Sequence, residues 1–215
     1  MKNTVFFDLD GTLTDPGEGI TNSVMYALKR FDITVNDPRE LYPFIGPPLT
    51  ESFMELYGFT YEQSMTAIKY YREYYIPKGI FENKLYDGID VMLKKLKSSG
   101  KTLVLATSKP EEMAERVLKK FEIYDSFDFV CGASMDETRT DKADVIRYAL
   151  SECKAKSDEC IMVGDRKHDI IGAHTNSMQA VGVLFGYGTK DELDEAGADH
   201  IVATVSELEN YLLSI

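Results

Sequence analysis

Two carboxylates stand close together near the start of the chain, where the apolar run 5–7 gives way to Asp8, Leu9, Asp10 and Gly11. Side chains two residues apart lie on the same side of an extended strand, so Asp8 and Asp10 are expected to meet at its carboxyl end. Like charges held so near oppose each other's ionisation unless a cation lies between them. Mg²⁺ is the natural cation for oxygen ligands. The alternative is a solvated turn, since Asp and Gly are common turn residues.

A second apolar run, 102–106, leads into Thr107 and Ser108, which precede an expected helix. A hydroxyl and free main-chain N–H groups at a helix start form a site that phosphate prefers. Simple helix capping explains the same residues equally well.

Two more acids, Asp165 and Asp169, follow the apolar run 160–163 and are four residues apart. This spacing lets both reach a shared cation, although acids at a helix start also favour the helix dipole. Lys142 opens an expected helix over 142–152, where a cation is misplaced and requires an anionic partner. His168 is not expected to be a metal ligand, because Mg²⁺ prefers oxygen.

These residues need a sheet to bring them together. Apolar runs bounded by turn residues predict buried strands at 5–7, 102–107, 127–131, 160–163, 180–185 and 200–205. Amphipathic segments between them predict helices, the last one capped by Ser206 with Glu209. Strand and helix in alternation indicate an α/β fold with a doubly wound, Rossmann-like parallel sheet, whose carboxyl strand ends form the ligand crevice.

One stretch, from about residue 15 to 83, shows no strand pattern. Its apolar residues recur at helical spacing in three segments, and Thr60 with Gln63 forms a capping box for the third. We therefore expect a core domain over 1–15 and 83–215, and an inserted all-helical cap domain over 16–82. A cap rooted beside Asp8 and Asp10 would exclude water from a reactive site.

The composition limits the function. The 215 residues are 44% hydrophobic and 28% charged, which is typical of a soluble globular protein, and the formal net charge is −12. Such a charge opposes binding to nucleic acid or to anionic membranes. No apolar stretch approaches the length of a membrane span or of a signal core, so we expect a cytoplasmic protein. The oligomeric state is left open.

Taken in order, the pattern D-x-D-G-T, a strand ending in Thr, a Lys and then G-D-x-x-x-D resembles the motif set of the haloacid dehalogenase superfamily. The segments Ile45-Gly46-Pro47-Pro48-Leu49 and Gly182-Val183-Leu184-Phe185-Gly186-Tyr187-Gly188 are similar to its phosphoglycolate phosphatase-like branch, which includes 5′-nucleotidase-like members. The resemblance implies a Mg²⁺-dependent phosphatase that acts on a small phosphorylated metabolite.

The resemblance also implies residue roles. Asp8 would be the nucleophile and Asp10 the general acid and base. Mg²⁺ would be held by Asp8, Asp10 and Asp165, with Asp169 in support; for Asp10, the main-chain carbonyl can serve the metal. Phosphate would be bound by Gly11, Thr12, Thr107, Ser108 and Lys142. In the cap, Gly46 and Arg72 are the candidates for substrate contact.

Several alternatives remain beside this interpretation. A phosphosugar mutase of the same superfamily shares every motif, and differs only in whether the phosphoryl group passes to water or back to a sugar phosphate. A receiver domain would need its acceptor aspartate on the third strand and no helical insert. A non-catalytic relative would not need Asp10. Departures from the family pattern occur at Ser108, where relatives often have Asn, and at Ala143, where they often have Pro.

Overall fold

The computed structural model describes residues 2–135 and 138–215. It contains two compact units: Met1–Thr14 with Leu85–Ile215, here called the core unit, and Asp15–Lys84, here called the helical unit. Each unit has its own hydrophobic interior and is described by itself. The chain passes from one to the other through two short paired strands, β2 (Thr14–Asp15) and β3 (Lys84–Leu85).

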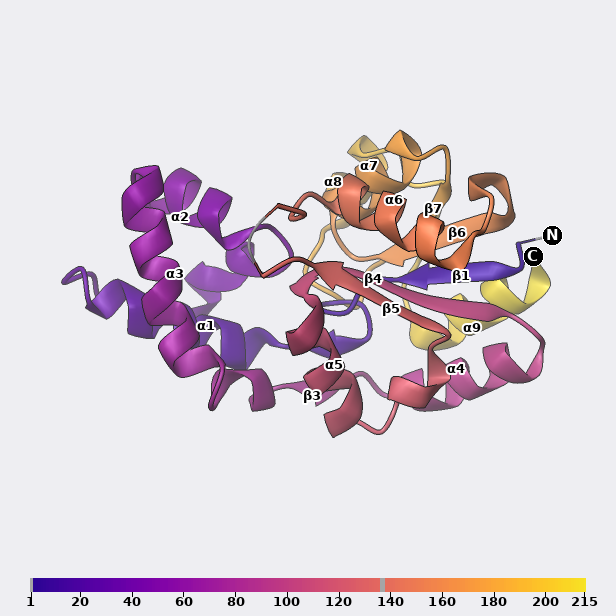
Figure 1. Ribbon diagram of the computed structural model, residues 1–215, viewed down its shortest axis with the longest axis horizontal. Helices are drawn as coiled ribbons and strands as arrows, with labels where there is room; N and C mark the ends of the chain where they lie inside the picture. Colours follow the sequence, from indigo (N-terminus) through magenta and orange to yellow (C-terminus); the bar gives the residue numbers. More distant parts are fainter. Residues whose placement is uncertain (1, 136–137) are drawn as a thin grey trace. The chain divides into compact units, whose positions relative to one another are not determined.

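The core unit is built on a six-stranded sheet in the order β5-β4-β1-β6-β7-β8 (Figure 1). Its strands are β1 (Thr4–Phe7), β4 (Thr102–Pro110), β5 (Phe129–Ala133), β6 (Cys160–Gly164), β7 (Gln179–Val183) and β8 (His200–Val202). All neighbouring strands in this sheet pair in parallel. β1 and β6 are buried along their whole length, as unbroken apolar runs in a parallel sheet require. The expected α/β, Rossmann-like fold is therefore confirmed.

Helices cover both faces of this sheet (Figure 1). One face carries α6 (Lys142–Cys153), α7 (Lys167–Thr175) and α8 (Lys190–Glu195), and the other carries α4 (Ile89–Ser98), α5 (Glu111–Lys120) and α9 (Val205–Ser214). On the first face, Phe6 of β1 lies in one buried cluster with Ile146 of α6 and Ile170 of α7. On the second face, Phe7 packs edge-on against Phe127, with ring centroids 6.4 Å apart. The alternation of Phe6 and Phe7 thus anchors both layers to the central strand.

Several predicted strand boundaries are wrong. The strands expected at 102–107 and 180–185 span Thr102–Pro110 and Gln179–Val183. The strand expected at 127–131 begins at Phe129, because Tyr124–Ser126 forms a 3-10 turn (η3) and the Asp128 side chain accepts a hydrogen bond from Leu103 N at 2.8 Å. The last strand, expected at 200–205, ends at Val202.

The predicted cap of the last helix is also wrong. Helix α9 is capped by Thr204, whose hydroxyl accepts from Glu207 N at 3.1 Å, and not by Ser206. Both pairs fit the same Ser/Thr-x-x-Glu pattern, and the earlier pair is used. Glu209 instead forms an ion pair with Lys95 of α4, with 2.7 Å between Nζ and Oε1.

The helical unit contains α1 (Gly17–Lys29), α2 (Leu49–Tyr57), α3 (Tyr61–Tyr75) and two 3-10 helices, η1 (Pro38–Phe44) and η2 (Gly79–Phe81). The predicted capping box of α3 is present: Thr60 Oγ1 accepts from Gln63 N, and Gln63 Oε1 accepts from Thr60 N. An aromatic cluster fills the interior, in which Phe53 stacks on Phe59 and meets Phe44 edge-on. This unit has its own core of rings.

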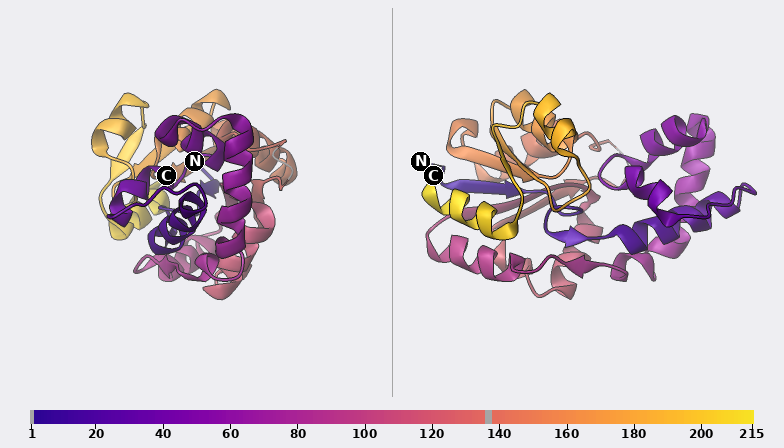
Figure 2. Two further views of the ribbon diagram at one scale, coloured as in Figure 1. Left: turned by 90° about the vertical axis from the view of Figure 1, so that its left-hand side faces the viewer. Right: turned by 180° about the vertical axis from the view of Figure 1, so that it is seen from behind.

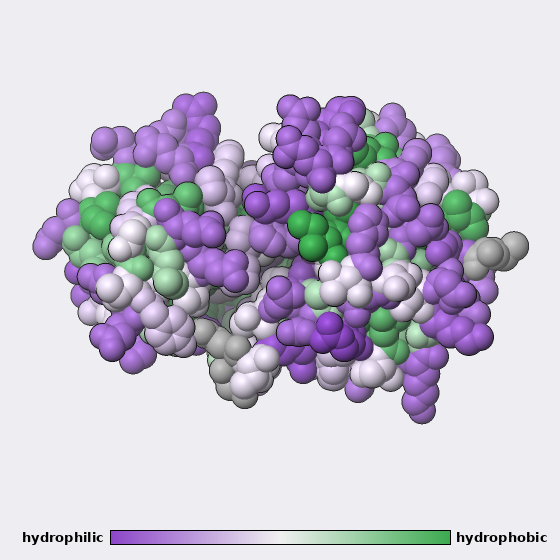
Figure 3. Space-filling view, turned by 90° about the horizontal axis from the view of Figure 1, so that it is seen from above, coloured by the Kyte–Doolittle hydropathy of each residue, from purple (hydrophilic) through white to green (hydrophobic). Residues whose placement is uncertain are grey.

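The two ends of the core unit lie close together (Figure 2). Lys101 Nζ donates to Lys2 O and to Ile215 O, both at 2.6 Å, and so ties the first strand to the end of the last helix. A short 3-10 helix, η4 (Ser157–Glu159), precedes β6. In the space-filling view, hydrophilic side chains cover most of the core unit's visible face, with small hydrophobic patches between them (Figure 3).

Candidate active site

Three neighbouring strands of the sheet, β4, β1 and β6, carry the predicted residues at their carboxyl ends. Phe7 is level with Leu105 on one side and with Val163 on the other, so the residues that follow emerge together. Asp8 N still donates to Val163 O at 2.9 Å, which fixes the direction in which the chain leaves β1. The site thus lies at the strand ends where doubly wound sheets hold their ligands.

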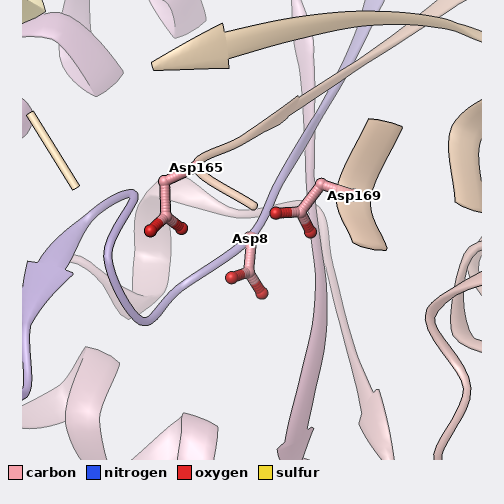
Figure 4. A group of neighbouring side chains, drawn as sticks. All are labelled: Asp8, Asp165 and Asp169. Carbon is pink, nitrogen blue, oxygen red and sulfur yellow. The ribbon is translucent and has the colours of Figure 1, made fainter. Parts of the chain in front are cut away.

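The carboxylates of Asp8, Asp165 and Asp169 converge at this edge (Figure 4). One oxygen from each can be chosen so that all lie within 4.8 Å of one another, and all three residues are buried. Asp8 follows β1, Asp165 follows β6, and Asp169 lies in the first turn of α7. Three buried oxygen donors at this spacing are suited to a hard divalent cation.

Lys142, the first residue of α6, joins two of these acids. Its Nζ lies 2.7 Å from Asp8 Oδ1 and 2.8 Å from Asp169 Oδ1, and it donates to Ala106 O at 3.1 Å. Burial opposes the charge on this lysine, but attraction by Asp169 and Asp8 prevails and raises the pKa of Lys142. The lysine that seemed misplaced at a helix start therefore has anionic partners.

Asp165 is held on both sides. Thr12 Oγ1 donates to Asp165 Oδ1 at 3.1 Å, and Tyr187 N donates to Asp165 Oδ2 at 2.8 Å. Burial, together with repulsion from Asp169 and Asp8, raises the pKa of Asp165 to about 8. Lys142 alone therefore does not balance the negative charge of the cluster, which a bound divalent cation would do.

Asp169 is fixed by the turn that follows β6. Its Oδ2 accepts from Arg166 N at 3.1 Å. A side chain at Gly164 would place its Cβ 2.1 Å from Asp169 Cγ, so only glycine lets the carboxylate lie there. Burial raises the pKa of Asp169 to about 6, with Lys142 opposing that shift and Asp8 adding to it.

The loop after β1 passes directly over Asp165. Gly11 has a φ of +88°, and a Cβ there would lie 2.2 Å from Asp165 Oδ2. A Cβ on Gly186, in the loop after β7, would lie 2.2 Å from Gly11 O. Gly11 and Thr12, expected at the phosphate, are thus both packed against Asp165.

Asp10 does not belong to the three-carboxylate cluster. Its Oδ2 pairs with Lys109 Nζ, and both side chains are buried. Its other oxygen, Oδ1, is buried and has no hydrogen-bond partner among the described residues. Burial raises the pKa of Asp10, with Lys109 opposing that shift and Asp8 adding to it.

Thr107 lies in the last part of β4, where the register with β5 shifts between Thr107 and Pro110. Its Oγ1 accepts from Lys109 N at 3.2 Å, so the hydroxyl hydrogen can point elsewhere. Ser108 is half-buried beside it, and α5 begins three residues later, at Glu111. The hydroxyl and the helix start expected here are both present.

The residues expected to contact substrate from the insert, Gly46 and Arg72, belong to the helical unit. Gly46 has a φ of +106°, and Arg72 lies on α3. The neighbouring tyrosines of α3 are used for packing: Tyr70 meets Phe31 edge-on at 6.1 Å between centroids. His168, in the first turn of α7, is not one of the three clustered ligands.

One residue of the site was not singled out from the sequence. Lys109 follows the Thr107-Ser108 pair directly, and nothing in the local sequence indicates that its side chain reaches Asp10. The hydrogen bond from the main-chain N–H of Tyr187 to Asp165 could not be predicted from the sequence either, since the two residues are 22 positions apart. The glycines around Tyr187 were the visible signal, as close approach of a loop needs residues without side chains.

Comparison with known proteins identifies the class. The family model of haloacid dehalogenase-like hydrolases matches residues 5–183. A 5′-nucleotidase of Pseudomonas aeruginosa is 41% identical over 210 residues, covering 98% of this chain and 95% of that protein. The crystal structure of a predicted phosphatase from Clostridium acetobutylicum is 49% identical, with a TM-score of 0.98 over the whole of both chains. The tyrosine-protein kinase PtkA of Mycobacterium tuberculosis is 37% identical, covering 97% of this chain and 72% of that protein.

The chain therefore belongs to the haloacid dehalogenase-like hydrolase family, as its motifs predict. Within that family it is a phosphatase, a hydrolase of phosphoric monoesters. Such an enzyme acts on a small phosphorylated substrate. Among the helices of the described ranges, none is long and apolar enough to cross a membrane.

Proposed function

We propose that this phosphatase is Mg²⁺-dependent and hydrolyses a small monoester, of the phosphoglycolate or nucleoside monophosphate class, through an aspartyl-phosphate on Asp8. The observation that carries the proposal is the convergence of Asp8, Asp165 and Asp169 at the carboxyl ends of adjacent strands, with Lys142 paired to Asp8 and Asp169. This arrangement gives one carboxylate, Asp8, a place beside both a cation site and an ammonium group. An anionic phosphate needs such a local excess of positive charge in a chain of net charge −12.

The donor set fits Mg²⁺. Asp8 and Asp165 would hold the ion with the main-chain carbonyl of Asp10, and Asp169 would support it. All of these are oxygen donors, which Mg²⁺ prefers over nitrogen or sulfur. Burial, and after it the nearby carboxylates of Asp169 and Asp8, raise the pKa of Asp165, and a bound cation would oppose that shift. When bound, the ion would supply positive charge against the phosphate oxygens as charge builds in the transition state.

The remaining steps fall to the chain's own residues. Asp8 attacks phosphorus, and the bond from phosphorus to the leaving oxygen breaks. Asp10 donates a proton to that oxygen and later takes one from the water that hydrolyses the aspartyl-phosphate. Lys142 and the Thr107 hydroxyl bind the phosphate oxygens, and so hold phosphorus in line with Asp8.

The helical unit is proposed to be the cap that selects the substrate, with the core unit carrying the chemistry. The name of the Pseudomonas relative supports nucleoside monophosphates as one class to test first. The mycobacterial relative is named a tyrosine kinase, which would pass a phosphoryl group to a phenol instead of to water. A phosphosugar mutase would return it to a sugar phosphate. The acceptor therefore has to be measured along with the substrate.

A panel of phosphate esters tests the proposal. It contains phosphoglycolate, nucleoside monophosphates, sugar phosphates, pyrophosphate and 4-nitrophenyl phosphate, with release of inorganic phosphate as the readout. We expect release that requires Mg²⁺, stops with a chelator, and falls to background in Asp8→Asn. The matched control is Asp125→Asn, which changes an exposed aspartate of the core unit and should keep full activity.

Two results would overturn parts of this proposal. Turnover retained in Asp8→Asn would remove Asp8 as the nucleophile. Isomerisation of a sugar phosphate that outpaces phosphate release would identify a mutase.

A further inference from the structure

The site contains two buried lysines, and they divide the carboxylates between them. Lys142 pairs with Asp8 and Asp169, while Lys109 pairs with Asp10. The side chains of both lysines are only 5% exposed. In the proposed function Lys142 binds the phosphate, whereas Lys109 has no assigned role.

Burying an ammonium group costs free energy that even a good ion pair only partly offsets, so a buried lysine in the site calls for a functional explanation. Lys109 is brought to Asp10 by an irregularity at the end of β4, where the register with β5 shifts between Thr107 and Pro110. Its main-chain N–H is used by Thr107 Oγ1, so one residue supports two predicted functional groups. The side chain then crosses to the loop after β1, 99 residues earlier in the chain.

The contact fixes one oxygen of Asp10 and leaves the other available. Lys109 Nζ engages Oδ2, whereas Oδ1 is buried and unpartnered among the described residues. The ion pair at Oδ2 restricts rotation of the Asp10 carboxylate. It therefore also restricts the position of the second oxygen, Oδ1. Oδ1 is then the oxygen that can exchange a proton with the substrate.

We propose that Lys109 is a positioning residue, which holds Asp10 by Oδ2 so that Oδ1 meets the leaving oxygen. The inference rests on the proposed role of Asp10 as general acid. In the first step the proton on Asp10 Oδ1 passes to the bridging oxygen, while that oxygen takes the electron pair of its bond to phosphorus and Asp8 forms the new bond. In the second step Asp10 Oδ1 takes a proton from water, the water oxygen bonds to phosphorus, and Asp8 recovers its electron pair.

The test uses the dependence of the first step on the leaving group. An alcohol that leaves as an alkoxide needs the proton of Asp10, whereas 4-nitrophenolate leaves without it. We expect Lys109→Met, assayed with saturating Mg²⁺, to lower kcat/KM for an alkyl phosphate at least ~10-fold more than kcat/KM for 4-nitrophenyl phosphate. This difference is smaller than the whole contribution of a general acid, which is ~10²–10⁴-fold, because the variant still has Asp10. Inhibition by inorganic phosphate should be unchanged, because phosphate binding is left to Lys142 and Thr107.

Equal losses for both leaving groups, or no loss, would overturn the proposal. Weaker inhibition by inorganic phosphate would also overturn it, since Lys109 would then be a phosphate ligand. If Lys109→Met does not fold, Lys109→Gln is measured in the same way and judged by the same results. Lys109→Arg keeps the charge and should recover much of the rate for the alkyl ester.

Asp10→Asn separates this inference from the function on which it rests. If Asp10→Asn lowers kcat/KM equally for the alkyl phosphate and for 4-nitrophenyl phosphate, Asp10 is not the general acid. If Asp10→Asn shows the dependence and Lys109→Met does not, only the positioning role of Lys109 fails. With both assignments right, Lys109→Met adds little further loss in the Asp10→Asn background, because the two changes remove one function.

Discussion

At the scale of single residues, the carboxylates of the proposed site differ in the groups that partner them. Asp8 and Asp169 share Lys142, and Asp10 pairs with Lys109, while Asp165 accepts hydrogen bonds from the neutral donors Thr12 Oγ1 and Tyr187 N. Asp165 is therefore the acid that most needs a further cation. The pKa of Asp165 is raised, which means that its ionised form is unfavourable in the site as long as no cation is bound.

Asp165→Asn should separate the stability of the fold from metal binding. Without metal, wild-type Asp165 keeps its proton up to about pH 8 in the folded state, while the unfolded chain loses it near the ordinary value of 3.8. The folded state thus binds more protons across this range, and stability falls as the pH rises through it. Asparagine carries no such charge, so the metal-free variant should lose less stability than wild type over that range.

Thermal unfolding checks this prediction with and without Mg²⁺. Wild type should gain about 2.7 kcal/mol when Mg²⁺ exceeds its Kd ~100-fold, and Asp165→Asn should gain much less. The gain in wild type should be larger above pH 8 than near pH 6, because the ion then has no proton to displace. Equal gains in both proteins would contradict the metal role of Asp165.

How far single residues could be predicted depended on local signals. Lys142 could be found, because a lysine at a helix start lacks a local reason and so requires an anion elsewhere. Lys109 could not, because it looks like any lysine before a proline, and its partner lies in the loop after β1, far away in the sequence. The sequence did not show that the Asp10 carboxylate pairs with Lys109, although it left the main-chain carbonyl of Asp10 as the group for the metal.

At the scale of elements, the loops after the strands are shaped around the acids. The loop after β1 passes so near Asp165 that Gly11 has no room for a side chain. Gly164, the last residue of β6, likewise has no room for a side chain beside Asp169. Close packing of these segments thus restricts where the carboxylates of Asp165 and Asp169 can lie.

Gly11→Ala and Gly100→Ala form a matched pair that tests this role. Both glycines have a φ of +88°, but a Cβ at Gly100 meets no atom within 4 Å, while one at Gly11 would lie 2.2 Å from Asp165 Oδ2. Each change should cost about 1–2 kcal/mol through its backbone conformation. Gly11→Ala should in addition lower kcat and weaken Mg²⁺ binding, while Gly100→Ala keeps both. Comparable activity of the two variants in the phosphate-release assay would argue against the packing account.

The elements themselves were predictable where burial is continuous. β1 and β6 appear in the sequence as unbroken apolar runs, and the structure places them at the centre of the sheet. Boundaries failed where a side chain replaced a main-chain bond, as Asp128 does beside β5. The start of α9 failed because two overlapping patterns offered the same cap.

At the scale of the whole molecule, chemistry and selection are assigned to separate units. The core unit holds all the converging acids, and the helical unit holds the aromatic cluster and Arg72. The helices of this unit were evident from periodicity, but its contacts with a substrate were not, because packing and recognition use the same aromatic residues.

Arg72→Met tests whether the helical unit selects the substrate. If it does, kcat/KM for the best ester of the panel should fall ~10-fold or more, which corresponds to one lost contact of about 1.4 kcal/mol. The rate with 4-nitrophenyl phosphate should stay the same, since its phosphate is handled by the core unit. The matched control is Lys69→Met, an exposed cation of the same helix. Equal losses with both esters would contradict a selective role for Arg72.

The most direct test of the central claim is to locate the covalent phosphate. Asp10→Asn, in which hydrolysis of the intermediate should be slow, is mixed with substrate and Mg²⁺, quenched and reduced with borohydride, which converts an aspartyl-phosphate to homoserine. Peptide mass mapping should find homoserine at position 8, and only when substrate was present. An unmodified Asp8 beside a covalent phosphate on another residue would contradict the mechanism proposed for this enzyme.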